Sequence, residues 1–185
     1  MVNLTKSHLP DVGKYKEYIN KIFVSGWLSN NGQFVQELQR RLQEYLGINS
    51  KMNEFQDAMG LCILDDMKAI LEERKRVYDY YIENLPKELQ VQEQNTDSTA
   101  NYAYFPVVFN TEETLLKVKE KLNQNAINPM RYFYPSLDKL PYVYEEFQVP
   151  VATSISKRIL CLPMYDTLSD EELYEIIKFL KEALQ

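Results

Sequence analysis

Residues 102–109 read YAYFPVVF, and this stretch decides the fold class of the chain. Its aromatic and β-branched side chains favour a strand over a helix. Pro106 lacks a backbone N–H, which places the strand at a sheet edge or beside a bulge. Two more extended segments are expected, at 127–134 and 158–162. Three such segments in the second half of the chain predict a small sheet.

Helices separate and follow these expected strands. They are predicted at 111–125, 151–157 and 169–184. Asn110 with Glu113 marks the start of the first helix, and Ser169 with Glu172 forms a capping box for the last. The order strand, helix, strand, strand, helix indicates an α+β fold, in which a small antiparallel sheet carries helices on one face.

The first half of the chain is helical by its periodicity. Helices are predicted at 14–24, 33–46 and 52–63, with a further helical stretch to about residue 85. The apolar stripes of the second and third helices are Phe34, Leu38, Leu42 and Tyr45, and Phe55, Met59 and Cys62. A break is expected at Asp65 and Asp66. The polar residues 86–101 have no period and are expected to form an exposed linker. The predicted domain division is an N-terminal helical segment 1–47, a long helical segment 48–85, a linker 86–101 and a small α+β domain 102–185.

The charge balance of the chain excludes several classes of partner. The 21 Lys and Arg residues against 27 Asp and Glu give a net charge of −6. Nucleic-acid-binding proteins usually show a basic face, so this balance argues against such a partner. No apolar run approaches the ~18–20 residues of a membrane span, and residues 1–6 lack the features of a signal peptide. We therefore expect a cytoplasmic protein that binds neither nucleic acid nor a membrane.

Three residue types that often build sites are scarce. All 5 glycines lie at or before Gly60, and neither G-x-G-x-x-G nor G-x-x-x-x-G-K-[ST] occurs. Because loops that cradle phosphate need glycine, a self-contained nucleotide site of these types is not expected. His8 is the single histidine, so no metal site is expected. Cys62 and Cys161 lie in apolar runs and are expected to be buried, reduced thiols.

Several stretches resemble, in the same order, motifs of the DegT/DnrJ/EryC1/StrS family. They are VNLTK at 2–6, SGWLSNNG at 25–32, EL at 37–38, EYLG at 44–47, GINSKMNEFQDAMGL at 47–61, RYFYP at 131–135 and RILCLPMY at 158–165. The stretch 47–61 is similar to the family pattern G-x-N-x-[KR]-M-x-E-x-Q-A-A-x-G. The resemblance implies a fold-type I, pyridoxal-phosphate-dependent aminotransferase acting on nucleotide-linked keto-sugars in polysaccharide biosynthesis. The motif WLSNNG most resembles that of the viosamine-type branch, which makes 4-amino-4,6-dideoxyhexoses.

One departure from the family concerns its large cofactor domain, which lies between the opening helices and the G-x-N-x-K-M motif. Here residues 46–49 (LGIN) join these pieces directly, so the resemblance implies that the domain is missing between Gly47 and Asn49. The Schiff-base lysine, the aspartate that pairs with the pyridinium nitrogen and the phosphate-binding turn are then missing too. Thr5-Lys6 mimics the family's Thr-Lys, but it lies in an N-terminal lead that is expected to be exposed. Pyridoxal phosphate is therefore the family's cofactor, but we expect this chain to bind none and to hold no catalytic residue.

Five residues are candidates for binding, all by resemblance. Asn49 corresponds to an asparagine that reaches, across a dimer, the phosphate of the partner's cofactor; alternatively it caps a turn. Trp27 forms an aromatic wall near the sugar, or alternatively anchors a core. Arg131, Tyr132 and Tyr134 line the sugar–nucleotide cleft, where an arginine can hold a diphosphate bidentately. The alternative for these three is an amphipathic strand edge with a solvated arginine.

Two hypotheses follow for the function of the chain. The first is an internally truncated aminotransferase of the dTDP-4-keto-6-deoxyhexose type that is inactive alone. The second is a helix-mediated interaction module that pairs with itself or with a full-length aminotransferase. Removal of the large domain would uncover the apolar stripes, so we expect self-association, and substitutions Leu38→Asp and Phe55→Asp are expected to disperse the oligomer. An enzyme of an unrelated class has little support, since no nucleophile–base pair stands out.

Overall fold

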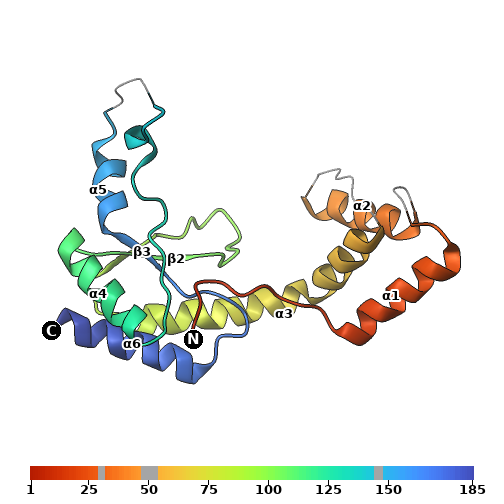
Figure 1. Cartoon of the computed structure of the whole chain (residues 1–185), viewed down its shortest axis with the longest axis horizontal. Coiled ribbons are helices and arrows are strands. Elements are labelled where there is room, and N and C mark those ends of the chain that lie inside the picture. The colour runs from red at the N-terminus through yellow and green to blue at the C-terminus, as the bar shows by residue number, and fades with distance from the viewer. Residues whose placement is uncertain (29–31, 47–53, 144–147) are drawn as a thin grey trace. The chain divides into compact units, whose positions relative to one another are not determined.

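The computed structural model describes residues 1–28, 32–46, 54–143 and 148–185 (Figure 1). The chain divides into two compact units. One, called the sheet unit below, comprises Met1–Lys6 and Leu71–Gln185, and the other, called the helical unit, comprises Ser7–Ile70. Helix α3, Glu54–Asn84, contributes its first half to the helical unit and its second half to the sheet unit.

The helical unit also contains α1, Val12–Ser25, and α2, Gln33–Leu46, close to the predicted ranges. The carboxylate of Asp11 begins α1 by accepting a hydrogen bond of 2.8 Å from the Lys14 N–H. Gly26 ends that helix in the left-handed region, with a φ of 69°. Glycine suits this position because it has no Cβ to clash there.

The apolar stripes of the helical unit pack on one another. Its buried core consists of Ile22, Phe34, Leu38, Ala58 and Leu61. Leu38 packs closely on α3 at Gly60, where an added Cβ would lie 2.9 Å from the leucine Cδ2. Of the stripe predicted on the third helix, Cys62 is buried, whereas Phe55 and Met59 are partly exposed. The predicted stripe residue Tyr45 lies in α2, but its side chain is outside the described part of the structure.

The break expected at Asp65 and Asp66 is wrong, because α3 runs without interruption through 31 residues. Aspartate lowers helix propensity by less than ~1 kcal/mol per residue, so tertiary contacts can override it. Asp65 pairs with Lys14 and with Arg41, each at 2.7 Å, and Asp66 lies 3.4 Å from the His8 ring. These ion pairs hold the acids on the helix surface. Within the described ranges, no helix combines the length and the apolar character needed to cross a membrane.

The sheet unit is built on three antiparallel strands in the order β1–β2–β3. The strands are β1, Gln90–Val91; β2, Phe105–Val108; and β3, Ile159–Leu162. The helices that follow the second half of α3 are α4, Glu112–Gln124; the short η1, Leu137–Lys139; α5, Pro150–Arg158; and α6, Asp170–Leu184. In the register of the central pair, Phe105 lies opposite Leu162 and Val108 opposite Ile159. The predicted α+β architecture is therefore confirmed.

Helices cover one face of this sheet. The second half of α3, α4 and α6 lie on the same side of β2 and β3 (Figure 1). The strands bury Phe105, Val107, Leu160 and Leu162 toward them. Helix α6 buries an apolar face that includes Leu173, Ile176, Ile177 and Leu180. The capping box of Ser169 and Glu172 is also confirmed, with both reciprocal hydrogen bonds formed.

The strand expected at 127–134 is not formed. This segment makes two single bridges, one from Ile127 to Val2 and one from Met130 to Cys161. Pro129 stands between the bridged residues and has no N–H to donate to a ladder. The segment therefore contacts the sheet at Met130 without extending it.

Two smaller expectations also need correction. The polar stretch 86–101 contains β1, which pairs Val91 with Val107, so it is not wholly an exposed linker. Helix α4 begins one residue later than expected, because Thr111 rather than Asn110 accepts the capping hydrogen bond, from the N–H of Thr114. The four-segment domain division stays a prediction.

Candidate functional site

Arg131 is held in place by two helices of the sheet unit. Its Nη2 donates to Oε1 of Glu112 at 2.8 Å, in the first turn of α4, and to the carbonyl of Lys157 at 2.9 Å, near the end of α5. Its guanidinium lies over the ring of Tyr134, 3.6 Å from the ring centroid. The side chain is 12% exposed, so the alternative of a solvated arginine at a strand edge is wrong. The hydrogen bond from Arg131 holds the pKa of Glu112 below its usual range.

Of the aromatic residues in the RYFYP motif, Tyr134 contacts Arg131, whereas Tyr132 packs on other rings. The ring of Tyr132 packs edge-on against Tyr104, with the ring centroids 5.7 Å apart. It packs in a tilted arrangement against Phe133, with the centroids 5.4 Å apart. Tyr134, which stacks on Arg131, is exposed on its other side. Arg131, Tyr132 and Tyr134 lie in one short segment, and their role in binding stays a prediction.

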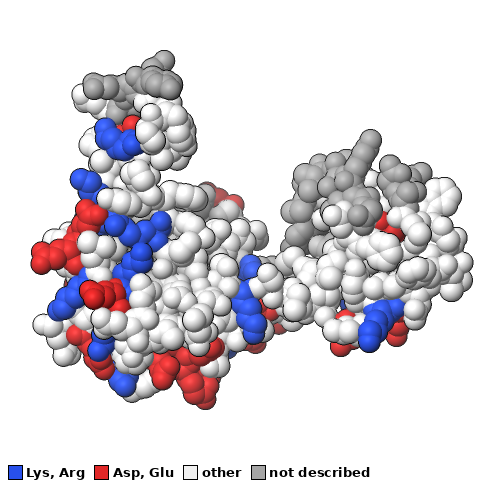
Figure 2. All heavy atoms as spheres, in the orientation of Figure 1, with Lys and Arg blue, Asp and Glu red and all other residues white. Residues whose placement is uncertain are grey.

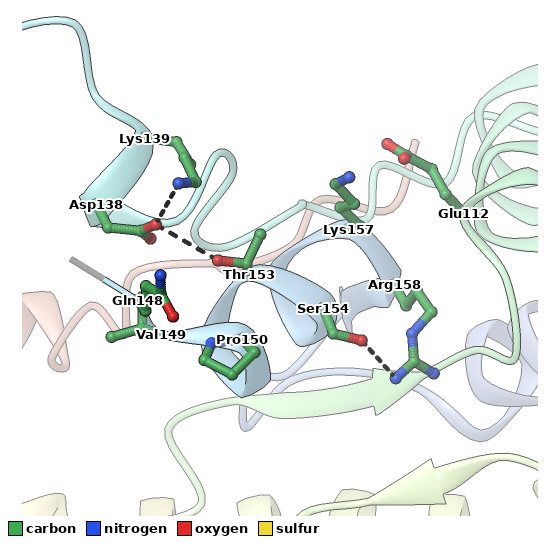
Figure 3. Close-up of a pocket in the computed structure, with 10 residues that line it drawn as sticks. All are labelled: Glu112, Asp138, Lys139, Gln148, Val149, Pro150, Thr153, Ser154, Lys157 and Arg158. Carbon is green, nitrogen blue, oxygen red and sulfur yellow. Dashed lines mark hydrogen bonds and ion pairs between the residues drawn. The ribbon is translucent and has the colours of Figure 1, made fainter. Parts of the chain in front are cut away.

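A hollow of about 590 Å³ lies beside Arg131's partner Glu112, between η1 and α5 (Figure 3). Its lining comprises Glu112, Asp138, Lys139, Gln148, Val149, Pro150, Thr153, Ser154, Lys157 and Arg158. Figure 3 shows Glu112, Lys157 and Arg158 on one side of it, with Asp138 and Lys139 on the other. Basic side chains are visible along the part of the sheet unit that carries α5 and η1, with acidic ones between them (Figure 2).

Asp138, in η1, contacts Thr153 of α5 across this hollow. One carboxylate oxygen accepts a hydrogen bond of 2.5 Å from the Ser136 hydroxyl, and the other lies 3.4 Å from the Thr153 hydroxyl and 3.1 Å from Lys139 Nζ. The Ser136 hydrogen bond and the Lys139 charge lower the pKa of Asp138, which keeps the carboxylate charged. Sequence reasoning missed this hollow, because its residues come from three distant segments with no common motif.

The remaining candidate residues lie elsewhere. Trp27 belongs to the helical unit and is 52% exposed, so its alternative role as a core anchor is wrong. Asn49 lies outside the described residues. Cys62 and Cys161 are buried and unpaired, as the sequence predicts, and burial raises the pKa of each thiol, to about 11 for Cys161. Neither cysteine is therefore poised as a nucleophile.

The described residues do not fit pyridoxal phosphate. A Schiff-base amine must lose its proton, which requires burial or a neighbouring cation. No lysine in the described ranges is buried. Hydrogen bonds to Asp65 and Asp79 raise the pKa of Lys14 and of Lys75, which favours the protonated amine. The described residues also contain no group of three or more His, Cys, Asp or Glu side chains that could hold a metal ion.

Comparison with known proteins decides the family. The model of the DegT/DnrJ/EryC1/StrS aminotransferase family matches residues 17–181. This chain belongs to that family. A dTDP-4-amino-4,6-dideoxy-D-glucose transaminase of Escherichia coli is 31% identical over 145 residues, which cover 72% of this chain and 38% of the relative. A GDP-perosamine synthase of Escherichia coli O157:H7 is 24% identical over 140 residues, which cover 75% of this chain and 38% of that relative.

Solved structures agree with this assignment. The aminotransferase TlmJ from Streptoalloteichus hindustanus superposes with a TM-score of 0.67 at 18% identity, over 72% of this chain and 36% of that one. DesI, solved in the presence of its TDP-sugar product, gives a TM-score of 0.64 at 25% identity, over 72% and 36%. This DegT/DnrJ/EryC1/StrS chain thus has the aminotransferase fold over the matched part, and it spans less than two fifths of the length of these relatives.

Proposed function

We propose that this chain is an internally shortened relative of the nucleotide-sugar aminotransferases of the dTDP-4-keto-6-deoxyhexose type, without aminotransferase activity on its own. The observation that carries the proposal is that each lysine of the described residues is at least partly exposed. The short span relative to the family members supports it. The proposed junction, between Gly47 and Asn49, lies outside the described residues. By the same proposal, the protein is cytoplasmic and its ancestor served polysaccharide biosynthesis.

Binding of pyridoxal phosphate tests this proposal. The full chain is mixed with pyridoxal phosphate, treated with borohydride and analysed by peptide mass spectrometry. We expect low, scattered modification of surface lysines and no saturable aldimine absorbance. The Escherichia coli transaminase treated in parallel provides the positive control. Saturable labelling of a single lysine in this chain, at one cofactor per chain, would overturn the proposal.

We further propose that Arg131, Tyr132 and Tyr134 belong to a surface that binds the nucleotide diphosphate of the sugar substrate. Among the described residues, the buried Nε of Arg131 has no hydrogen-bond partner and its Nη2 makes two contacts, while the side chain as a whole is 12% exposed. An arginine can use its remaining donors for a phosphate oxygen. For Asn49, which lies outside the described residues, we propose by resemblance a contact with the phosphate of a partner's cofactor, and for Trp27, in the helical unit, a contact with the sugar.

An NMR titration with dTDP tests the binding surface separately from catalysis. We expect shifts of the Arg131 side-chain signal and of the amides of residues 130–135, and weaker binding in the Arg131→Lys variant, which keeps the charge but loses the planar fork. Arg40→Lys, on the surface of the helical unit, serves as the control. Absence of any shift at high dTDP concentration would contradict the binding surface but not the proposed loss of aminotransferase activity.

A second candidate function is an interaction module that pairs with itself or with a full-length aminotransferase. The observation favouring it is a set of large apolar side chains that stay exposed in the helical unit: Leu9, Val12, Phe23, Val24, Trp27 and Leu28. Exposed apolar surface of this kind often marks a contact with another protein. Sedimentation of the chain over a range of concentrations, alone and with the full-length relative, tests it. A single monomeric species under all these conditions would contradict this function.

A further inference from the structure

Two carboxyl groups are buried next to each other in the helical unit. Glu54 is 1% exposed and Asp57, one turn further along α3, is 0% exposed. Carboxyl groups are almost never fully buried unless they are paired. The partners of these two groups therefore decide what charge each can carry.

Glu54 is fully partnered. Its Oε2 accepts a hydrogen bond of 3.1 Å from the N–H of Phe34, and its Oε1 accepts one of 2.9 Å from the N–H of Val35. Both N–H groups lie in the first turn of α2, whose backbone donors have no partner within that helix. The positive end of the helix dipole also favours an anion there. Glu54 thus caps α2 from α3.

Asp57 has no such partner. Neither of its oxygens makes a hydrogen bond with a described residue. On its own helix, it faces the negative charge of Glu54. From α2, the N–H groups at the helix start bind Glu54, and from α1 the hydroxyl of Tyr15 donates to the carbonyl of Phe55 at 3.2 Å.

Several cations of the described helical unit are paired with other acids. Lys14 and Arg41 pair with Asp65, and Arg40 pairs with residues of its own helix, Glu37 and Glu44. His8 lies beside Asp66. None of these ion pairs includes the Asp57 carboxyl, so they do not offset its burial. Burial, with a contribution from Glu54, raises the pKa of Asp57 from 3.8 to about 6.

We infer that the enclosed, unpartnered carboxyl of Asp57 takes up a proton when α1, α2 and the first half of α3 fold together, so that the helical unit is a switch that tightens on acidification. Below the unfolded pKa of 3.8 both states hold the proton, and this stabilisation is fully present. Between that value and about 6 the folded state binds more protons, so its stability falls as the pH rises. Above a pH of about 6 the stabilisation by the bound proton is completely lost. The folding equilibrium constant of the helical unit is then about 100-fold lower than at low pH.

Trp27 provides a probe for this unit alone, because it is the single tryptophan of the chain and lies in the helical unit. Urea unfolding of the full chain is followed by tryptophan fluorescence from about pH 4.5 to about pH 7.5, a window that covers most of the linkage. We expect the unfolding constant of the wild type to rise tens-fold over this range and then to level off. Asp57→Asn removes the titrating group and is expected to abolish the dependence.

Glu17→Gln is the matched control, because it removes one carboxylate from an exposed position of α1. This variant should keep the wild-type pH dependence. Asp57→Ala, with a small apolar side chain, should be more stable than the wild type at neutral pH and also independent of pH. If the unfolding constant of Asp57→Asn depends on pH as strongly as that of the wild type, the inference is overturned.

A second measurement keeps the inference testable if a variant fails to fold. In the wild-type chain, carbon-detected NMR of aspartate carboxyl groups should show one group that titrates about two pH units above the others. Absence of such a group in the folded chain would also overturn the inference.

Discussion

The hydroxyl of Tyr81 donates a hydrogen bond of 2.8 Å to the backbone carbonyl of Pro163. Tyr81 is completely buried in the sheet unit, and its ring packs against Phe105 at a centroid distance of 4.7 Å. Burial raises the pKa of its hydroxyl well above the ordinary value, so the group stays a protonated donor. This single side chain therefore links α3 to the sheet and to the segment that leaves β3.

Tyr81→Phe removes the donor while preserving the ring. The Pro163 carbonyl would then stay buried without this partner, which costs about 1–3 kcal/mol. The loss should appear as a lower urea midpoint of the sheet unit, measured by hydrogen exchange of β2 and β3. Tyr174→Phe, on the exposed face of α6, is the control and should change the midpoint little. Equal midpoints for the two variants would show that the Tyr81 hydrogen bond contributes nothing.

The capping box of α6 offers a second test within the sheet unit. The Ser169 hydroxyl accepts the N–H of Glu172 at 3.2 Å, and Glu172 accepts the N–H of Ser169 at 2.9 Å. Ser169→Ala should lower the free energy of unfolding by about 1 kcal/mol, whereas Ser169→Asp should restore most of it, because aspartate is also a good cap. Thermal unfolding by circular dichroism measures both. If Ser169→Ala and Ser169→Asp lower the free energy of unfolding equally, the loss of the cap does not cause the destabilisation.

Gly32 stands where the helical unit leaves no room for a side chain. A Cβ at this position would lie 2.3 Å from Oε1 of Glu54 and 2.8 Å from the Trp27 ring. Gly32→Ala should therefore displace the Glu54 carboxylate from the N-terminus of α2 and destabilise the helical unit by about 1–2 kcal/mol, the usual loss for a cap. Urea unfolding followed by Trp27 fluorescence measures the change.

A double-mutant cycle separates this effect from a general loss of glycine. In the Glu54→Ala background, Gly32→Ala should cost less, because the Glu54 carboxylate is already gone and only the contact with the Trp27 ring remains. Additive losses in the double variant would mean that Gly32 acts through something other than Glu54.

Local sequence patterns predicted most of the secondary structure, because helix periodicity and capping depend on residues that are close together in the chain. The helix at 33–46 and the capping box at Ser169 follow from periodicity and capping chemistry within a few residues. The continuity of α3 through Asp65 could not be predicted this way, because it depends on Lys14 and Arg41 from other helices.

The candidate site was predictable only in part. The motif RYFYP drew attention to Arg131, but its contacts with Glu112 and with the Lys157 carbonyl join segments far apart in sequence. The strand expected at 127–134 is not formed, and the reason is also non-local. Strand pairing requires a neighbouring strand with matching free donors and acceptors, which local sequence patterns do not show. The buried pair Glu54 and Asp57 is also invisible to periodicity, since acids in the first turn of a helix normally lie at its surface.

The packing of Leu38 changes which substitutions should test self-association. The sequence alone predicts that Leu38→Asp disperses an oligomer, but Leu38 is buried in the core of its own unit. Placing an aspartate there would bury an unpaired charge, which costs several kcal/mol. Leu38→Asp should therefore unfold the helical unit, seen as a shift of Trp27 fluorescence to that of the urea-unfolded chain. By contrast, Val24 on α1 is 90% exposed and supports no internal packing.

Val24→Asp should leave the fold intact and weaken self-association. Asn20→Asp, at another exposed position of α1, introduces the same charge without removing an apolar side chain and serves as the control. Sedimentation equilibrium should give a dissociation constant for Val24→Asp at least several-fold above those of the wild type and of Asn20→Asp, because burying an apolar side chain contributes about 1.5–3 kcal/mol. Circular dichroism and Trp27 fluorescence should be the same for all three proteins. If Val24→Asp and Asn20→Asp associate equally, the repulsion comes from charge alone and the exposed apolar side chain of α1 does not mediate the contact.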